Sequence, residues 1–253
     1  MQEKYTLELI QKGKRVDGRK FDEFRKIEIE PDIVKKAEGS ALVKIGKTKV
    51  IAGVKLALGT PYPDTPEEGI LIVNAEFSPI ASPDFEPGPP GEDAIELARI
   101  VDRGIRESNC IEVNKLCITP KEKVWMVFVD LNIIDNNGNL LDASSLAAIT
   151  ALLHTKLPKI EDDDIIRGEY TGNLPVVFKP IIVSIGKIGN NLIIDPNLEE
   201  EEILDSKLSV AVRDDNKICA LQKQGSGTFE FSDVERMIDL AIEKSRELRK
   251  LVV

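Results

Sequence analysis

The sequence predicts an α+β fold of two related modules, and three observations indicate it. Strand-like segments of alternating or continuous apolar character recur in both halves of the chain. Each half closes with a helix-like segment, at residues 141–153 and at residues 232–251. The acidic run at residues 161–164 has the composition of a surface linker between the halves. We therefore expect one module with an N-terminal helix over residues 1–160 and a second module over residues 161–253.

The first half begins with a short helix and continues into strands. Residues 3–13 place Leu7 and Ile10 on one side of that helix, with charges around them. The Asp-Gly pair within residues 15–19 predicts a tight turn, because glycine supplies the positive φ that such a turn needs. The expected strands, of which the second and third flank a Gly-Lys hairpin turn, are residues 27–30, 40–46, 48–55 and 70–77.

A proline-rich loop then leads into a long amphipathic helix. Residues 78–92 contain five prolines, which predicts a long extended loop of a kind that often has a function. The helix is expected over residues 92–108. Its apolar residues recur at i, i+3, i+4, i+7 and i+11, and this core-facing stripe consists of Ala94, Leu97, Ala98, Val101 and Ile105.

Strands and helices alternate through the rest of the chain. Two strands, a turn at residues 136–139 and an apolar helix capped by Asp142 or Ser144 complete the first half. The second half ends in a helix that begins with a capping box of Ser232 and Glu235. The expected strands are residues 115–119, 124–134, 175–185, 191–195, 208–213 and 218–222.

The composition is that of a folded globular protein. Its 253 residues can bury a sizeable core, and 42% hydrophobic with 31% charged residues argue against disorder. There is no apolar run of 18 residues, and the first residues lack the apolar core and cleavage site of a signal peptide. Three cysteines without C-x-x-C spacing argue against a disulfide framework and a zinc knuckle. We expect a cytoplasmic protein with no membrane contact, no metal and no cofactor.

Three arginines form the strongest candidate site. Arg99, Arg103 and Arg106 lie at i, i+4 and i+7 on one helix face, away from the apolar stripe. Guanidinium groups match phosphate oxygens, which favours an anion or phosphate clamp. The alternative is a solvated face whose like charges are partly offset by acids. Those acids are Glu96, Asp102 and Glu107. Because the net charge is −10, nucleic acid is expected only at a local basic patch or through a basic partner.

Other groups have a simpler explanation beside the functional one. An acidic cluster has enough carboxylates for Mg²⁺, but an exposed loop and helix start also explains it. The cluster consists of Asp195, residues 199–202 and Asp205. We interpret His154 as a structural histidine and the cysteines as core residues. The cysteines are Cys110, Cys117 and Cys219.

Two loop segments complete the candidates. Lys121 and Lys123 lie in a Pro-Lys-Glu-Lys stretch, for which a solvated turn is the default. Gly186, Gly189 and residues 224–227 are only loosely similar to glycine-rich phosphate loops, and we interpret them as ordinary turns. The P-loop and dinucleotide fingerprints are absent from the sequence.

Six segments form a specific set by their order and spacing. They are residues 15–19, 25–30, 39–52, 94–99, 129–130 and 142–148. Together they resemble the RNase PH family over roughly residues 10 to 250. The resemblance implies an RNase PH-like fold of two pseudo-symmetric β-α modules. Within the family, the sequence is most similar to the non-catalytic RNase PH-like subunits of the archaeal exosome.

The resemblance also implies partners and a function. Such a subunit alternates with a catalytic paralogue in a hexameric ring of three heterodimers, which RNA-binding cap proteins join. The ring degrades single-stranded RNA from the 3′ end, with inorganic phosphate as the attacking group. The chain is thereby expected to structure the active site of its partner and to bind the RNA.

Departures from the catalytic pattern imply that the chain is not itself an enzyme. Two RNA-binding arginines of active members are Glu92 and Asp93 here. The phosphate-binding arginine is replaced by a leucine, in Ser144-Ser145-Leu146. Two aspartates of active members, six residues apart, correspond to Glu201 and Lys207. A lysine at the second position neither acts as the general acid in the family's way nor ligates a metal.

The resemblance finally gives the arginine face a role. Arginines on this helix are implied to approach the catalytic partner's site and to contact RNA phosphates. Arg99 and Arg103 match that pattern best, and Arg106 matches it less closely. Two alternatives stay open, namely an active phosphate-dependent 3′-to-5′ exoribonuclease and a purely architectural ring subunit.

Overall fold

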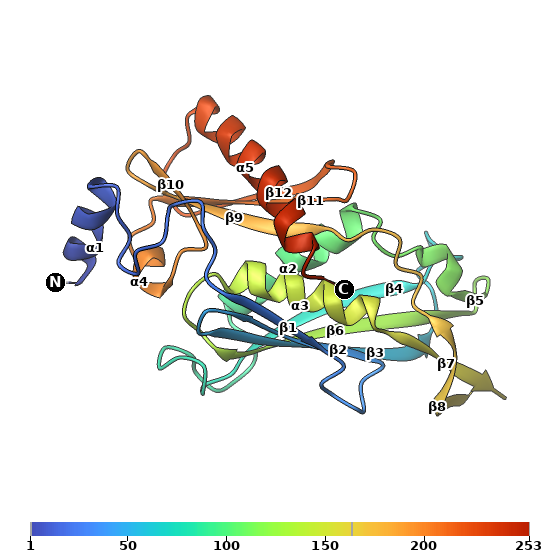
Figure 1. Ribbon diagram of the computed structural model, residues 1–253. Coiled ribbons are helices and arrows are strands. Elements are labelled where there is room, and N and C mark those ends of the chain that lie inside the picture. The colour runs from blue at the N-terminus through green and yellow to red at the C-terminus, as the bar shows by residue number, and fades with distance from the viewer. Residues whose placement is uncertain (1, 163, 253) are drawn as a thin grey trace.

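The computed structural model describes residues 2–162 and 164–252, which form four stacked layers. In Figure 1 the C-terminal helix α5 (Phe231–Arg249) lies at the top, above the second sheet. Helices α2 (Glu92–Glu107) and α3 (Leu140–Leu153) lie between this sheet and the first sheet. The predicted α+β fold is confirmed.

The first sheet has six strands in the order β1-β2-β3-β6-β4, with β5 paired to β6. The pairs are antiparallel except for β4 with β6, which is parallel. Alternate residues of β3 are buried, because successive side chains point to opposite faces of the sheet. The strands are β1 (Ile27–Pro31), β2 (Gly39–Ile45), β3 (Thr48–Gly59), β4 (Ile70–Phe77), β5 (Cys117–Thr119) and β6 (Lys123–Asp135).

The second sheet is fully antiparallel, in the order β10-β9-β11-β12. Helix α5 packs against β9 and β11, and helices α2 and α3 also contact β9. The strand β9 is consequently covered on both sides and almost wholly buried. The strands are β9 (Ile181–Ile188), β10 (Asn191–Ile194), β11 (Ser206–Val212) and β12 (Ile218–Gln224).

The two inner helices join the sheets into one core. Every residue of α3 from Leu141 to Leu152 is buried, because β2 and β3 pack on one side and β9 on the other. Helix α2 comes close to the second sheet at Gly104, where an added Cβ would lie 3.1 Å from Ile182 of β9. The predicted stripe of α2, which begins at Ala94 and ends at Ile105, is buried as expected.

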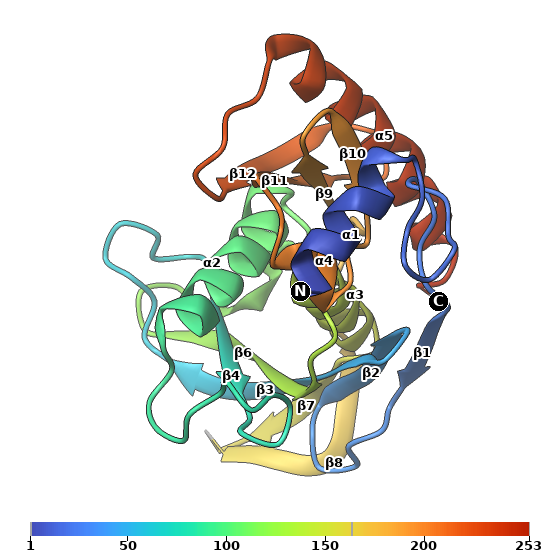
Figure 2. The same cartoon turned by 90° about the vertical axis from the view of Figure 1, so that its left-hand side faces the viewer.

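Two short helices lie at the edge of the second sheet. In Figure 2 the N-terminal helix α1 (Gln2–Gln11) crosses in front of α4 (Leu198–Glu201), and the two are in contact. The helix α4 agrees with the helix start that the sequence indicated at residues 199–202. None of the described helices combines the length and the apolar character that a bilayer crossing requires.

The acidic run between the halves is not a linker, so that interpretation is wrong. Glu161, Asp162 and Asp164 lie at the tip of a hairpin formed by β7 (Lys156–Glu161) and β8 (Asp164–Asn173). The fourth member, Asp163, lies outside the described residues. The hairpin projects from the body of the molecule (Figure 1). Its strands carry many exposed polar residues, which is why their pattern did not indicate a buried strand.

The helix caps also differ from expectation. Helix α3 begins after Asn139 rather than at Asp142 or Ser144, and both of those residues are buried inside the helix. Helix α5 has a capping box of Glu230 and Asp233, two residues before the predicted pair. The strand expected at residues 115–119 is shorter, because its first two residues belong to a 3-10 helix, η1 (Val113–Leu116), and only β5 (Cys117–Thr119) is extended. The strand expected from residue 175 begins at Ile181.

Candidate functional site

The three candidate arginines project from the exposed side of α2, but they are not equivalent. Arg106 donates from Nη2 to the Asp102 carboxylate at 2.8 Å and to the carbonyl of Leu71 at 3.0 Å. The hydrogen bonds to Asp102 raise the pKa of this guanidinium. Arg106 is therefore tied to its own helix and to β4, and its charge is matched by a carboxylate. For Arg106, the structure therefore agrees with the alternative to a phosphate clamp, namely a solvated face whose charge is offset by an acid.

Arg99 and Arg103 lie together in a groove of about 320 Å³. Ile95 and Ile100 supply its apolar lining, one helical turn from the arginines. Arg103 donates from Nη1 to Oε1 of Gln222 on β12, at 3.2 Å. Within the described part of the chain, neither arginine forms an ion pair, so the offsets expected from Glu96 and Glu107 are not made. Two exposed guanidinium groups are thus available to an anion.

A second cavity of about 270 Å³ is lined by three of the residues by which the sequence departs from the catalytic pattern. Asp93, Glu201 and Lys207 all line it, together with the rings of Phe77 and Phe85, which are in contact at an angle of 35°. Nζ of Lys207 lies 3.3 Å from a carboxylate oxygen of Glu201. The pair neutralises itself, so this cavity offers no free ammonium to a phosphate and no paired aspartates to a metal.

The segment Ser144-Ser145-Leu146 lies within α3 and is buried. Leu146 is completely enclosed, and Ser144 is also inaccessible. An aliphatic side chain in this position has no donor for a phosphate oxygen. The position that the resemblance associates with phosphate binding is thus part of the hydrophobic core here.

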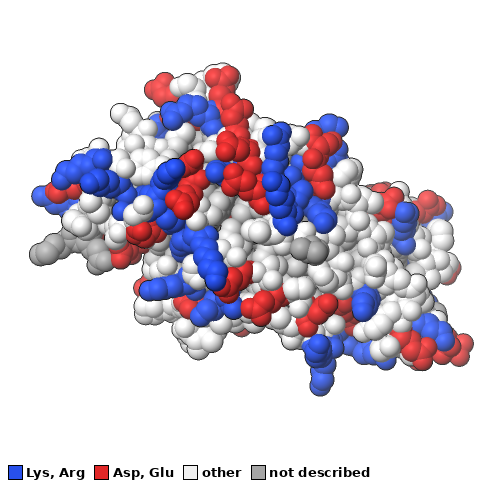
Figure 3. Space-filling model, in the orientation of Figure 1, with Lys and Arg blue, Asp and Glu red and all other residues white. Residues whose placement is uncertain are grey.

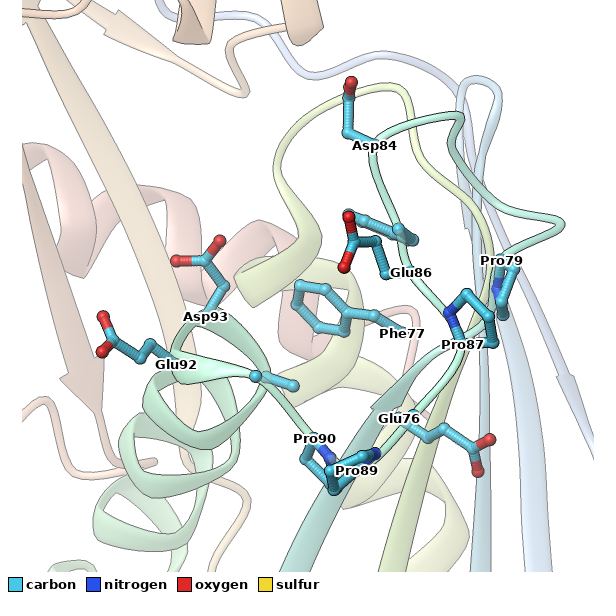
Figure 4. Close-up of a pocket in the computed structure, with 14 residues that line it drawn as sticks. Glu76, Phe77, Pro79, Asp84, Glu86, Pro87, Pro89, Pro90, Glu92 and Asp93 are labelled. Carbon is cyan, nitrogen blue, oxygen red and sulfur yellow. The ribbon is translucent and has the colours of Figure 1, made fainter.

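The proline-rich loop and the start of α2 enclose a third cavity, of about 580 Å³. Figure 4 shows Asp93 at the helix start and Glu86 on the loop, with the ring of Phe77 between them. No lysine or arginine is among the lining residues. The carboxylates of this wall are Glu76, Asp84, Glu86, Glu92 and Asp93. Such a wall repels phosphate. The arginine groove is of mixed charge, because Glu92 and Glu96 line it beside Arg99 and Arg103.

The predicted acidic cluster is divided by the fold. Glu200 is fully buried and accepts from Nε of Arg15 at 2.8 Å, while Nη1 of Arg15 donates to the Ile194 carbonyl at 2.8 Å. The expectation of an exposed acidic loop is therefore wrong at this position. Among the described residues, no group of three or more acidic, histidine or cysteine side chains is placed to hold a metal.

Asp195 is the second buried acid of that cluster. Arg25 contacts its Oδ1 at 2.6 Å, Arg19 contacts its Oδ2 at 3.0 Å, and the Asn139 amide donates to Oδ1 at 2.9 Å. Burial opposes ionisation of this carboxyl, but the hydrogen bonds and charge of Arg25 outweigh it, so the pKa of Asp195 lies below its ordinary value. Arg19 and Arg25 thus attach the N-terminal segment to Asp195, which directly follows β10 of the second sheet.

The remaining candidates have structural places. Nδ1 of His154 lies 2.9 Å from the carbonyl of Thr150 at the end of α3, which confirms a structural histidine. Cys110 is buried, and burial raises the pKa of its thiol. Cys117 and Cys219 are half-buried, and none of the three is in a disulfide.

The loop candidates also have ordinary places. Lys121 lies in a turn with positive φ, and Lys123 begins β6. Gly186 lies within β9 rather than in a turn, which corrects that expectation, whereas Gly189 and Gly225 have the positive φ of turns. On the face shown in Figure 3, basic and acidic side chains are mixed, with no large region of one sign. That face therefore offers no broad basic surface for nucleic acid.

Gln222 was missed by sequence reasoning. It lies 119 residues from Arg103, and only the pairing of β12 with β11 and the packing of α2 on β12 bring the two together. The buried role of Arg15 and Arg19 was missed as well. The one available signal was that both arginines lie in residues 15–19, a segment that resembles the family.

Two family models match the chain. Residues 23–158 match domain 1 of the 3′ exoribonuclease family, RNase PH, and residues 180–244 match its domain 2. The chain is 49% identical over 250 residues to the exosome complex component Rrp42 of Methanopyrus kandleri, covering 98% of this chain and 94% of that protein.

Solved structures give the same picture. The chain is similar to one in the Archaeoglobus fulgidus exosome with RNA bound to the active site, with a TM-score of 0.93, 48% identity, and 98% and 96% of the two chains covered. A chain of an archaeal exosome core matches with a TM-score of 0.88 and 45% identity, over 98% and 95% of the two chains. The predicted RNase PH-like fold with two domains is thereby confirmed.

Proposed function

This chain belongs to the RNase PH family of 3′ exoribonucleases, and from that premise we propose that it is a non-catalytic subunit of an archaeal exosome ring. Its similarity to Rrp42 over 98% of its length supports this role. The ring degrades RNA from the 3′ end. The role of the chain is to bind single-stranded RNA and to complete the active site of a catalytic paralogue.

The arginine groove is the observation that carries the proposal. Arg99 and Arg103 are exposed and share one groove, and no carboxylate of the described residues pairs with either. A guanidinium group in this state can donate to RNA phosphate oxygens. Arg106 contributes less, because Asp102 already satisfies it. A chain with a net charge of −10 can thus bind RNA at one local site.

The absence of intrinsic catalysis is supported by three replacements. Lys207 is paired with Glu201, Leu146 is buried in α3, and the acids at 92 and 93 reverse the sign of the charge at the start of α2. Phosphorolysis requires phosphate to be bound beside the RNA end and a proton to be supplied to the leaving oxygen. The cavity of this chain provides neither the arginine that binds phosphate in active members nor their pair of aspartates.

The partner is a catalytic paralogue with the same fold. Three heterodimers form a hexameric ring that cap proteins with RNA-binding domains join. A cytoplasmic location fits the three free cysteines. We expect the interface between the two subunits to exceed about 1,000 Å², which is the usual minimum for a specific contact.

Co-purification tests this role. The chain and a catalytic RNase PH-like paralogue are co-expressed and separated by size exclusion, and each is also purified alone. The expected result is a single species of hexameric size that degrades labelled oligo(A) with phosphate. A chain that stays separate from every catalytic paralogue tested contradicts the proposal. If substitution of Arg99 and Arg103 leaves the activity of the complex unchanged, the purely architectural alternative is favoured.

A further inference from the structure

Gln222 is a polar neighbour of Arg103 that comes from the other domain. Its Oε1 accepts from Nη1 of Arg103 at 3.2 Å, and its Nε2 donates to the carbonyl of Lys223 at 3.3 Å. The second hydrogen bond turns the amide so that its oxygen faces α2. The strand β12 holds Gln222 in register opposite Ser209 of β11, and the side chain is half-buried. The acceptor for Arg103 is therefore held by a paired strand.

The chemistry of this contact differs from that of the neighbouring arginine. Asp102 holds Arg106 with a carboxylate, which fixes the guanidinium and also cancels its charge. Gln222 holds Arg103 with a neutral amide, which fixes the guanidinium and leaves its charge intact. A guanidinium has five N–H donors, and this contact uses one of them. Arg103 thus keeps donors and a full positive charge for an anion in the groove.

We propose that Gln222 is a positioning residue for RNA binding, which holds the Arg103 guanidinium beside Arg99 in the orientation that receives a phosphate. This inference rests on the proposed function of the groove. The ordering of a long arginine side chain before binding reduces the conformational entropy that binding must otherwise remove. The second domain, through β12, thereby sets the geometry of an RNA contact on the first.

A double-mutant cycle tests the inference in the assembled ring. Gln222→Ala, Arg103→Ala and the combined variant are each titrated with labelled single-stranded RNA. We expect Gln222→Ala to weaken RNA binding several-fold when Arg103 is present, and to have no effect in the Arg103→Ala background. The KM for RNA should rise while kcat is unchanged, because the chemistry occurs in the partner. Gln11→Ala, at an exposed glutamine of α1, is the control.

The charged replacement Gln222→Glu gives a second readout. Its carboxylate forms an ion pair with Arg103, so we expect weaker binding than in Gln222→Ala. The dependence of affinity on salt should become less steep, close to that of Arg103→Ala, since one phosphate contact is lost. Glutamate has the size of glutamine and lies on a half-exposed site, so ring assembly is expected to survive, as size exclusion will check.

The outcomes separate the inference from the function on which it rests. If Arg103→Ala leaves RNA binding unchanged, the proposed function of the groove fails. If Arg103→Ala weakens binding but Gln222→Ala does not, or does so equally in both backgrounds, the positioning role of Gln222 is overturned while the groove stands. If Gln222→Ala disrupts the ring, Gln222→Glu is the test. A salt dependence as shallow as that of Arg103→Ala supports the positioning role of Gln222, and an unchanged salt dependence overturns it.

Discussion

The ammonium nitrogen of Lys207 lies 3.3 Å from a carboxylate oxygen of Glu201, beside a cavity that the rings of Phe77 and Phe85 help to line. By the family resemblance, two aspartates occupy these positions in active members. The ion pair has one charge of each sign where active members have two negative charges. The cavity therefore lacks the pair of negative charges that the resemblance associates with catalysis.

The isolated chain should show no phosphate-dependent RNA degradation. The physical reason is that Leu146 supplies no donor to phosphate, and that Lys207, which is paired with Glu201, does not act as the general acid in the family's way. Lys207→Asp alone should not create activity, because the buried leucine and the acids at 92 and 93 remain. The measurement is the release of nucleoside diphosphate from labelled oligo(A) with and without phosphate. Phosphate-dependent release by the purified chain without its partner contradicts this prediction.

Removing Arg15 should destabilise the chain strongly. The guanidinium and the Glu200 carboxylate are both fully buried, so Arg15→Ala leaves an unpaired buried charge. Such a change typically costs about 3–5 kcal/mol in the free energy of unfolding. The double variant Arg15→Met, Glu200→Leu should cost less than the sum of the two single changes. Urea denaturation measures the native chain, Arg15→Met, Glu200→Leu and the double variant, with Arg15→Ala measured beside them. Strictly additive losses in the cycle would argue against the pairing.

Asp142 should make stability depend on pH. This carboxyl is buried in α3, and burial raises its pKa to about 6, although hydrogen bonds from Ser184 and Asn139 partly offset the effect. The folded state therefore keeps a proton that the unfolded state loses. The free energy of unfolding should fall as the pH rises from 3.8 to about 6, by at most about 3 kcal/mol.

The variant Asp142→Asn should lack this decline, because an amide does not titrate. It keeps an acceptor for the Ser184 N–H, which donates to the carboxylate at 3.2 Å in the native chain. Denaturation at several pH values compares the two proteins. Asp195 acts in the opposite sense, since its lowered pKa means that its stabilisation is lost only as the pH falls below the ordinary value of 3.8. Parallel pH curves for the two proteins would refute the assignment to Asp142.

Periodicity predicted the regular part of the fold because burial repeats with the geometry of the element. The stripe of α2 and the alternation of β3 follow the helical and strand periods directly. The hairpin β7–β8 was missed because it projects from the core, so its polar strands lack an apolar pattern. The cap of α3 lies three residues before Asp142, and the cap of α5 lies two residues before Ser232, because several neighbouring polar residues are equally good cap candidates in sequence.

The candidate site was partly predictable for the same reason. The helical spacing placed Arg99 and Arg103 on one exposed face, and the structure places them in one groove. Spacing alone did not separate Arg106, because the rotamer that pairs it with Asp102 and Leu71 depends on tertiary packing. Gln222 was beyond local analysis, because the contact spans 119 residues.

Arg99 and Arg103 are proposed to bind RNA for a catalytic partner. The most direct measurement is a titration of labelled single-stranded RNA into the assembled ring at two salt concentrations, with the double variant Arg99→Glu, Arg103→Glu. Arg236→Glu is the matched control, since Arg236 is an exposed arginine on α5, away from the groove. Size exclusion confirms that each ring is intact.

We expect the double variant to bind RNA more than tenfold more weakly, because each charge-assisted contact contributes about 1.5–3 kcal/mol. The slope of log affinity against log salt should decrease by about 1.4, as expected for two lost phosphate contacts on a single strand. Arg236→Glu should change neither the affinity beyond a small uniform effect nor the rate of degradation. Unchanged affinity and rate in an intact double-variant ring would contradict the account and leave the arginine face a solvated surface.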